Sequence, residues 1–194
     1  MSAIGVLALQ GDWAAHASML RDLGVPAIFV RSAADFAGVR ALVIPGGESS
    51  TMLRLMETEG LAQRIVERTR SGMPVLATCA GVILVAETVV PNQPSLGLLS
   101  VEAERNAYGR QVHSTVARIQ VAPALGPPPQ MDAVFIRAPR ITCNDPSVEV
   151  FGTWHDDPVL VRQENILAAT FHPELTKDSR VHQTFLSMTE AKNG

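Results

Sequence analysis

The sequence predicts an α/β fold of three layers, with a mixed, mainly parallel central sheet and helices on both of its faces. In the first half of the chain, short continuous apolar runs alternate with helical patterns, and such runs are typical of strands covered on both faces. In the second half, segments of alternating polarity add strands to this sheet, and we expect these to be antiparallel. Alternation of strands and helices also implies right-handed crossovers between parallel strands.

The predicted elements of the first half follow one another without long gaps. Residues 3–9 form the first strand, and a helix from Ala14 to Leu23 ends at Gly24, a residue suited to a helix C-terminus. The next elements are strands over 27–30 and 41–44, a helix over about 51–70 with a break near Gly60, a strand over 74–77, and a helix that opens over 80–87.

The second half is rich in strands. Residues 98–121 have the alternating polarity of extended segments, and residues 123–129 form a proline-rich loop that we expect at the surface. Further strands are predicted over 133–136, 148–151, 159–161 and 166–171, and a final helix runs from about Ser179 to Thr189.

Length and composition limit the classes of protein to consider. The 194 residues suffice for one domain with a sizeable core, so we expect a single domain over residues 1–194. A net charge of −3 argues against a nucleic-acid or membrane-surface partner. No run approaches the roughly 18 apolar residues that span a bilayer. The apolar N-terminus lacks the basic start of a signal peptide, so we expect a cytoplasmic protein with both cysteines reduced.

Cys79 lies between an apolar run and a helical pattern, so the sequence places it at the apex of a strand-to-helix turn. Its neighbours Ala77, Ala80 and Gly81 are small, as a strained turn of this kind requires. The N-terminus of the following helix would stabilise the thiolate, which is the reactive form of cysteine. A buried free cysteine is more often inert, and the small neighbours are what favour a nucleophile here.

His172 and Glu174 follow the apolar run 166–171 and are therefore expected at the end of a strand. In an open α/β sheet the carboxyl ends of the strands carry the site. Together with Cys79 they could form a triad in which thiol, imidazole and carboxylate serve as nucleophile, general base and orienting group. The alternative is that these two residues have no catalytic role and are a surface histidine and a solvated glutamate.

Two further stretches could contact a substrate. Gly46 and Gly47 follow a strand and could direct backbone N–H groups at a developing oxyanion, although a glycine turn before a capped helix would look the same. Arg105, in a polar run, and Arg137, at a strand end, could each bind a ligand carboxylate, and the sequence does not decide between them.

We expect no metal site and no cofactor, because no group of residues has metal-ligand spacing. Cys143 is interpreted as a bystander. The remaining histidines are isolated in sequence and are interpreted as structural or exposed: His16, His113, His155 and His182.

Taken together, the motifs resemble a known family. TCAG (78–81) with FHPE (171–174) is similar to the class I, triad-type glutamine amidotransferases. A more specific ordered set resembles the glutaminase subunits of pyridoxal 5′-phosphate synthases: GVLALQG (5–11), PGGES (45–49), ERNAYGRQ (104–111), FIRAP (135–139) and HPELT (172–176). The resemblance extends from about residue 4 to residue 186. The chain departs from the family at Ala77, where glycine is common, and in the proline-rich segment from Pro123 to Gln130.

The resemblance implies hydrolysis of L-glutamine to glutamate and ammonia, with Cys79 as nucleophile, His172 as base and Glu174 as its orienter. It further implies a large hetero-oligomer in which the ammonia passes to a barrel-shaped synthase subunit that makes pyridoxal 5′-phosphate. The N–H groups of Gly47 and Ala80 are the candidate oxyanion hole. The residues implied to line the glutamine site are Gly47, Glu48, Ser49, Arg105, Ile136 and Arg137.

Three alternatives remain open at this point. The chain could be the glutaminase subunit of another amidotransferase, such as imidazole glycerol phosphate synthase, although the string 104–111 argues against that enzyme. It could be a noncatalytic, amidotransferase-like binding protein, which an intact triad disfavours. It could also be a cysteine peptidase or another hydrolase built on the same sheet, which tests of other amide substrates would reveal.

Overall fold

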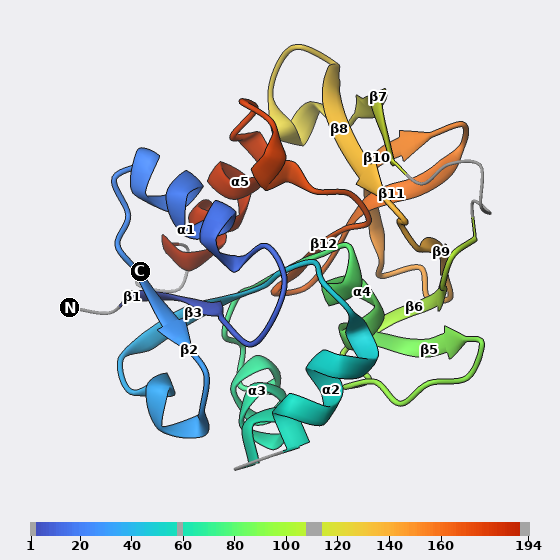
Figure 1. Cartoon of the computed structure of the whole chain (residues 1–194). Coiled ribbons are helices and arrows are strands. Elements are labelled where there is room, and N and C mark those ends of the chain that lie inside the picture. Colours follow the sequence, from blue (N-terminus) through green and yellow to red (C-terminus); the bar gives the residue numbers. More distant parts are fainter. Residues whose placement is uncertain (1–2, 58–59, 108–113, 191–194) are drawn as a thin grey trace.

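Two β-sheets organise the computed structural model, which describes residues 3–57, 60–107 and 114–190 (Figure 1). The larger sheet has nine strands in the order β2-β1-β3-β4-β12-β11-β10-β7-β8. Its first part is parallel and consists of β2 (Ala27–Val30), β1 (Ala3–Leu7), β3 (Val39–Ile44), β4 (Val75–Thr78) and β12 (Ile166–Ala169). The rest is antiparallel and consists of β11 (Asp157–Gln163), β10 (Glu149–Trp154), β7 (Ser114–Val121) and β8 (Gln130–Ile136). The predicted mixed, mainly parallel sheet is thus confirmed.

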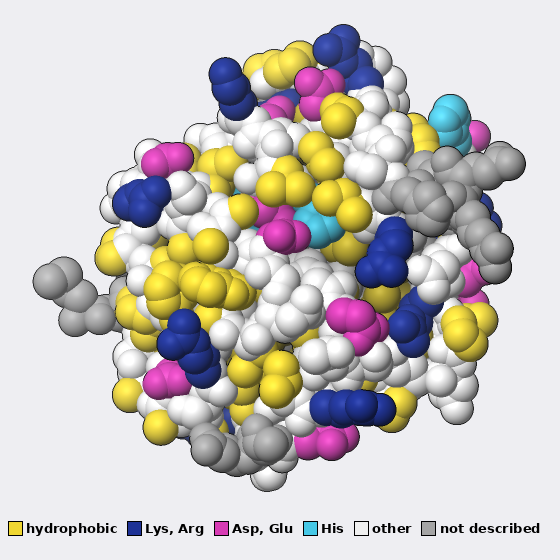
Figure 2. Space-filling view, viewed as in Figure 1, with side chains coloured by type: hydrophobic (Ala, Val, Ile, Leu, Met, Phe, Trp, Pro, Cys, Tyr) yellow, Lys and Arg dark blue, Asp and Glu magenta, His cyan; other side chains and the backbone are white. Residues whose placement is uncertain are grey.

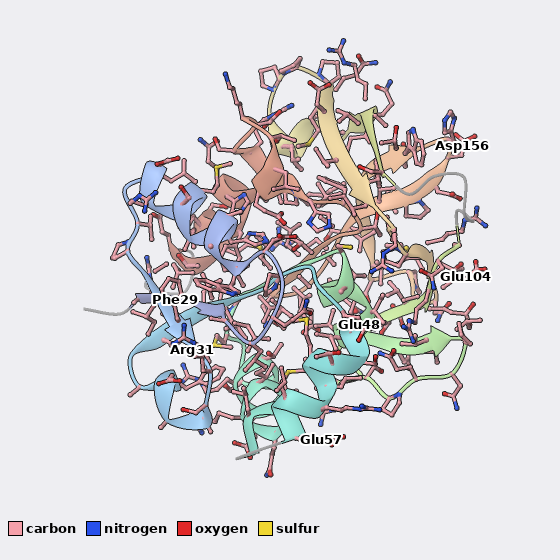
Figure 3. The ribbon with its side chains drawn as sticks, in the orientation of Figure 1. Phe29, Arg31, Glu48, Glu57, Glu104 and Asp156 are labelled. Atoms are coloured by element: carbon pink, nitrogen blue, oxygen red, sulfur yellow. The ribbon has the colours of Figure 1, made fainter. Side chains whose placement is uncertain are left out.

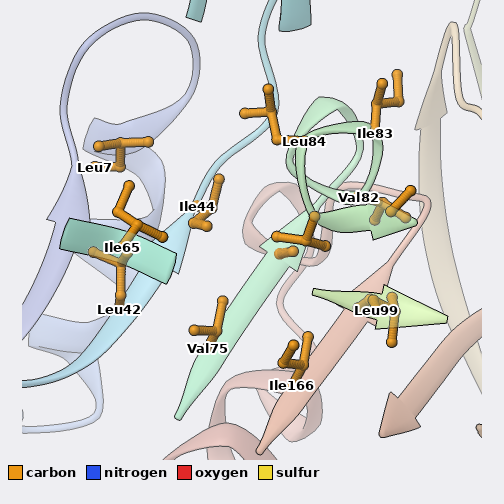
Figure 4. Packing of buried hydrophobic residues seen from close by; sticks show 14 of the residues in the cluster. Leu7, Leu42, Ile44, Ile65, Val75, Val82, Ile83, Leu84, Leu99 and Ile166 are labelled. Carbon is orange, nitrogen blue, oxygen red and sulfur yellow. The ribbon is translucent and has the colours of Figure 1, made fainter. Parts of the chain in front are cut away.

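Helices cover both faces of this sheet. On one face lie α1 (Trp13–Asp22) and α5 (Arg180–Glu190), and on the other lie α2 (Ser49–Glu57), α3 (Leu61–Arg70) and α4 (Ala80–Val85) (Figure 1). Alternating side chains of the strands feed two separate cores. In β3, Leu42 and Ile44 pack with the cluster under α2, α3 and α4, whereas Ala41 and Val43 pack with the cluster under α1 and α5. Figure 4 shows part of the first cluster, where Ile65 of α3 lies against Leu42.

The smaller sheet was not predicted as a separate unit. Its three strands have the order β5-β6-β9, with β5 at Ala86–Val90, β6 at Leu99–Glu104 and β9 at Arg140–Cys143. The helix predicted over 80–87 ends at Val85, and the chain then turns into β5. Because this stretch is a continuous apolar run rich in β-branched residues, its sequence pattern suits a buried helix and a strand equally.

Other boundaries agree with the predictions to within a few residues. The predicted break near Gly60 separates α2 from α3, and Gly60 has a left-handed φ of 68°. Short 3₁₀ helices are η1 (Ala33–Phe36), η3 (Pro123–Leu125) and η4 (Pro173–Leu175). Among the described residues, no helix combines the length and apolarity needed to cross a membrane.

The proline-rich loop between β7 and β8 is fastened to α5 by one side chain. The guanidinium of Arg180 donates hydrogen bonds to the carbonyl oxygens of Gly126 (2.9 Å), Pro128 (2.7 Å) and Gln130 (2.9 Å). Arg180 also pairs with Asp178 at 2.7 Å. The prolines of this loop are exposed, as predicted for a surface loop.

Candidate active site

Cys79 lies at a sharp turn between β4 and α4. Its φ of 48° and ψ of −109° are unusual for a residue with a side chain, and such strain is typical of a nucleophile elbow. Its backbone N–H donates to the carbonyl of Ala169 at 2.8 Å, which ties the turn to the end of β12. A Cβ atom at Gly81 would collide with the carbonyl oxygen of Ile44, so only glycine lets the turn pack this closely on β3.

His172 and Glu174 follow β12, the strand next to β4. The backbone N–H of His172 donates to the carbonyl of Val134 at 2.8 Å, which fixes it against β8. Its ring nitrogen Nδ1 lies 2.7 Å from Oε1 of Glu174 and 3.4 Å from Oδ2 of Asp12. Both His172 and Glu174 are buried. The carboxylate therefore holds the ring by Nδ1, and Nε2 remains for a different partner.

Cys79 is the second side chain that acts on this ring. Burial alone would lower the pKa of His172, but hydrogen bonds with Cys79 and Glu174, together with their negative charge, outweigh it and raise the pKa to about 10. An imidazole with a raised pKa holds its proton at neutral pH. Sγ of Cys79 also lies 3.6 Å from the carbonyl oxygen of Ile136. The predicted nucleophile, base and orienting carboxylate are thus adjacent.

The glycine pair after β3 borders the same site. A Cβ atom on Gly46 would lie 2.5 Å from Cε1 of His172 and 3.2 Å from Cβ of Cys79, so no larger residue fits. The Gly46 carbonyl accepts a long hydrogen bond of 3.3 Å from the N–H of Asp12. Ala80 begins α4, and its N–H therefore has no acceptor within the helix. The candidate oxyanion donors lie on two segments that flank Cys79.

These groups open into a cavity of about 340 Å³. Its volume is within the range of small-molecule sites. Of the residues implied by the family resemblance, all except Glu174 line it. In Figure 2, histidine, acidic and basic side chains come together in the middle of the face shown. The lining residues are Gln10, Gly11, Asp12, Gly47, Glu48, Ser49, Cys79, Ala80, Ile83, Arg105, Asn106, Ile136, Arg137 and His172.

Glu48 serves two neighbours at once. Its carboxylate accepts hydrogen bonds from Ser50 Oγ at 2.6 Å and from Thr51 N and Oγ1 at 2.8 Å each, and so caps the start of α2. These hydrogen bonds lower the pKa of Glu48 to about 2. Arg105 Nη2 lies 3.6 Å from Oε1 of the same carboxylate. Figure 3 shows Glu48 at the start of α2. The pair brings both signs of charge to the cavity wall.

The remaining predicted residues contribute in different ways. The hydroxyl of Ser49 is buried and donates to Oε1 of Gln93 at 3.2 Å. Ile136 presents its carbonyl oxygen to the thiol of Cys79. Arg137 has a left-handed φ of 46° and an exposed side chain, and it is the second arginine at the cavity.

Sequence reasoning missed several residues of the site. Gln10 accepts a hydrogen bond of 2.6 Å from the N–H of Glu48, and Asp12 reaches His172. Both belong to the loop after β1, and parallel strands place such loops at one edge of the sheet, which was the available signal. Asn106 and Ile83 also line the cavity.

The described remaining histidines are buried or exposed, as interpreted, but two of them are not isolated in space. His16 and His182, isolated in sequence, are both fully buried and in contact, with His16 Nδ1 3.0 Å from His182 Nε2. His155 is exposed beside Trp154. His113 and residues 108–111 of the polar string lie outside the described residues.

Asp12, His172 and Glu174 each offer an atom that could ligate a metal ion, and these atoms lie within 4.8 Å of one another. The sequence did not suggest this grouping. A proton on Nδ1 of His172, directed at Glu174 Oε1 with Asp12 Oδ2 nearby, accounts for the arrangement without a cation.

Comparison with known proteins agrees with this geometry. Residues 6–191 match the SNO glutamine amidotransferase family. Curated relatives named pyridoxal 5′-phosphate synthase subunit PdxT include one from Thermotoga maritima, 47% identical over 188 residues, which cover 96% of this chain and 99% of the relative. Another, from Solibacter usitatus, is 47% identical over 191 residues, which cover 96% of this chain and 99% of the relative.

Solved structures give the same result for the fold. A crystal structure described as a glutamine amidotransferase superposes with a TM-score of 0.90 at 42% identity, covering 97% of this chain and 99% of that one. A protein of Thermoplasma acidophilum described as a GMP synthase subunit superposes with a TM-score of 0.72 at 18% identity, covering 100% of this chain and 96% of that one, and supports the fold alone.

Proposed function

The chain belongs to the SNO glutamine amidotransferase family, and from this membership we propose how its candidate site works. The chain is the glutaminase subunit of a pyridoxal 5′-phosphate synthase: it hydrolyses L-glutamine to L-glutamate and ammonia and supplies the ammonia to a synthase subunit for vitamin B6 synthesis. The residues that perform this reaction are our proposal. The observation that carries it is the row of contacts in which His172 links Cys79 to Glu174.

In this proposal, the Cys79 thiolate attacks the side-chain amide carbon of glutamine. The C=O electron pair moves onto oxygen, and the N–H groups of Gly47 and Ala80 stabilise the resulting oxyanion. The protonated His172 ring gives its proton to the leaving nitrogen, so the C–N bond breaks, ammonia departs and a thioester forms. His172 then takes a proton from water, which attacks the thioester, and glutamate leaves with the thiolate restored.

Glu174 has a supporting role in each step. Its Oε1 accepts from His172 Nδ1 at 2.7 Å, which fixes the tautomer and directs Nε2 toward the thiol. The carboxylate also stabilises the imidazolium that precedes release of ammonia. This reasoning supports Glu174 as an orienting residue rather than a proton carrier.

Substrate recognition is proposed for the cavity wall. A bound glutamine has an α-carboxylate and an α-ammonium group, and Arg105, Arg137 and Glu48 offer charges of the matching signs. Gly47, Ser49 and Ile136 line the space between these charges and Cys79 and complete the proposed glutamine site.

The assembly and the cellular setting are also proposals. We propose that residues 1–194 act as one glutaminase domain in a large cytoplasmic hetero-oligomer with the barrel-shaped synthase subunit. The proposal of a single domain is supported by the nine-stranded sheet, which combines strands from the start of the chain with strands near its end. Co-purification with the synthase subunit and measurement of the mass of the complex test this part.

A labelling experiment tests the proposed site directly. An electrophilic glutamine analogue that alkylates thiols should add one equivalent to Cys79, located by peptide mass spectrometry, and should abolish glutamate release. Excess glutamine should protect the thiol. Labelling of Cys143 instead, or loss of activity without a Cys79 adduct, would remove Cys79 from the proposed role.

A further inference from the structure

Behind Glu174, on the side away from Cys79, lies a buried pair of histidines. His16 belongs to α1 and His182 to α5, the two helices on one face of the sheet (Figure 1). Both side chains are 0% exposed. His16 Nδ1 lies 3.0 Å from His182 Nε2, and His16 Nε2 lies 3.1 Å from Thr78 Oγ1 and 3.2 Å from Glu174 Oε2. Neither histidine lines the cavity that holds Cys79.

Both rings are neutral at neutral pH. Burial, and after it unfavourable electrostatic interaction with a protonated His182 or His172, holds the pKa of His16 well below its usual 6.5, and burial lowers the pKa of His182 to about 4. Each ring therefore carries one N–H and one bare nitrogen. The question is which nitrogen carries the proton.

The surroundings of Glu174 answer it. Oε2 is buried and lacks a well-aligned hydrogen-bond donor among the described residues, and His16 Nε2 approaches it at 3.2 Å. A bare Nε2 would direct its lone pair at a carboxylate oxygen, which is repulsive. A proton on Nε2 is instead shared between Thr78 Oγ1 and Oε2, with the better alignment toward Thr78.

This choice propagates to the second ring. If His16 Nε2 carries the proton, Nδ1 must accept, so His182 Nε2 must donate to it across 3.0 Å. His182 Nδ1 is then bare, and it is a buried atom without a hydrogen-bond partner. An unpaired buried acceptor is tolerated more often than an unpaired buried N–H. All contacts agree with one direction of donation, from His182 to His16 and on to Thr78 and Glu174.

We propose that His16 and His182 are positioning residues of the glutaminase, a relay of N–H donors that holds the Glu174 side chain oriented toward His172. The inference rests on the proposed function. His16 acts on the side of Glu174 opposite His172, and its bond to Thr78 also supports the residue that precedes Cys79. Neither histidine touches the substrate cavity, so the expected effect is on kcat and not on KM.

The hydrogen bonds from His182 through His16 to Glu174 should affect how kcat depends on pH. The titratable groups concerned are His172 and His16, which face Glu174, Cys79 and Asp12, which face His172, and His182, which faces His16. Loss of the His16 donor weakens the hold of Glu174 on His172, a contact that raises the pKa of His172, so the alkaline limb of the kcat profile should move to lower pH. A residue that only filled space would not move it.

The proton positions can be measured without substrate or partner. In the chain labelled with ¹⁵N-histidine, long-range ¹H–¹⁵N spectra at neutral pH should show neutral rings with the proton on Nε2 for both His16 and His182. His16→Gln and His182→Gln assign the signals. A proton on Nδ1 of His16, or a doubly protonated His16, would overturn the proposal.

Activity is then measured with saturating synthase subunit. His16→Leu should lower kcat about tenfold, as expected for loss of one hydrogen bond to a charged group, with KM unchanged and the alkaline limb moved to lower pH. His16→Gln keeps an N–H donor near the position of Nε2 and should recover most of the loss. Equal losses in the two variants would mean that only packing matters, and would overturn the proposal.

Two further variants distinguish the proposed effect from a general loss of folded protein. His182→Leu removes the second donor but replaces no side chain that contacts Glu174, and should give the same changes at about threefold. Thr69→Val, a buried change in α3 that removes only a bond to the Ile65 carbonyl, should leave kcat and pH profile unchanged. An unchanged profile in both leucine variants would contradict the inference. If the wild-type complex released no glutamate, the proposed function would fail, while the spectra would still decide the proton positions.

Discussion

The α-carbon of Gly46 faces the ring of His172 so closely that a methyl group on it would lie 2.5 Å from Cε1. Carbon atoms without a bond between them do not approach to this distance, so a side chain at position 46 must displace the ring or the glycine loop. The backbone after β3 and the imidazole after β12 are thus so closely packed that no side chain fits at position 46.

This fit leads to the first expectation, for Gly46→Ala. The ring of His172 must move away from Cys79 or the loop must move away from the oxyanion, and we expect kcat to fall by about 10²-fold or more. The melting temperature should change little, because the site opens into a cavity. Gly46 has no positive φ, so no backbone strain is expected there, and Gly24→Ala, whose Cβ would have open space around it, is the control for a glycine-to-alanine change away from His172. Wild-type kcat in Gly46→Ala would contradict the expectation.

Cys79→Ser should fold normally and release almost no glutamate. A serine hydroxyl is similar in size to a thiol but is much harder to ionise, so the nucleophile is lost and the packing is kept. Cys143→Ser is the matched control. Burial raises the pKa of the Cys143 thiol, which lies in β9, and its replacement should leave glutamate release unchanged.

His172 and Glu174 should differ in the size of their effects. His172→Ala removes the general acid and base, and we expect kcat to fall by roughly 10²–10⁴-fold. Glu174→Gln keeps a polar group beside Nδ1 but removes the charge that stabilises the imidazolium, so its loss should be smaller. Steady-state glutamate release from both variants measures this order, and a larger loss for Glu174→Gln would reverse the assigned roles.

Stability of the isolated chain should be greatest near pH 6.5. The pKa of His182 is lowered to about 4, so the unfolded chain takes up a proton below pH 6.5 that the folded chain refuses, and about 3 kcal/mol of stability is lost by pH 4. His16 acts in the same direction. The pKa of His172 is raised to about 10, so its contribution is complete below pH 6.5 and is lost as pH rises toward 10.

Urea unfolding at several pH values measures the loss of stability both below and above pH 6.5. His182→Gln cannot titrate in this range, so the loss on acidification should be smaller in this variant than in the wild type. A wild-type stability that rose steadily from pH 6.5 to pH 4 would contradict the neutral histidine pair.

The isolated chain should hydrolyse glutamine slowly, and the synthase subunit should raise the rate. The Gly46–Gly47 peptide can rotate at little steric cost, and the hydrogen bond from Asp12 to its carbonyl is long, at 3.3 Å. Docking that turns the Gly47 N–H toward the oxyanion would supply a donor that is typically worth about 10²–10³-fold in rate. Glutamate production with and without saturating synthase subunit measures this, and equal rates would reject partner activation.

The sequence predicted most of the parallel sheet because each of its strands is a continuous apolar run. It also predicted the turn at Cys79, since a strand, small residues and a helix follow one another directly. The β5-β6-β9 sheet was missed because Arg140–Cys143 is short and polar, and because the run from Val82 to Ala86 suits either a helix or a strand. Pairing of this kind depends on contacts between distant segments, which a local pattern does not carry.

In the site, too, local motifs predict some residues, whereas others depend on packing between distant segments. Cys79, His172 and Glu174 could be found from local motifs, and the comparisons agree with the family that those motifs suggested. His16 and His182 could not be found, because a histidine in an amphipathic helix has the same local pattern whether it is buried against a second histidine or exposed. Only the packing of α1 and α5 on one face brings them together.

The neighbouring positions of β4 and β12 have a consequence for how such a molecule can diversify. Cys79 and His172 follow the adjacent parallel strands β4 and β12, in which Thr78 pairs with Ala169. Arg105, Ile136 and Arg137 instead lie at the ends of β6 and β8. Reactivity and recognition are therefore carried by separable parts of one scaffold. Recombination of the peripheral strands could alter what the cavity accepts while the reactive pair stays intact, which makes the β6 and β8 ends the rational place to graft a new specificity.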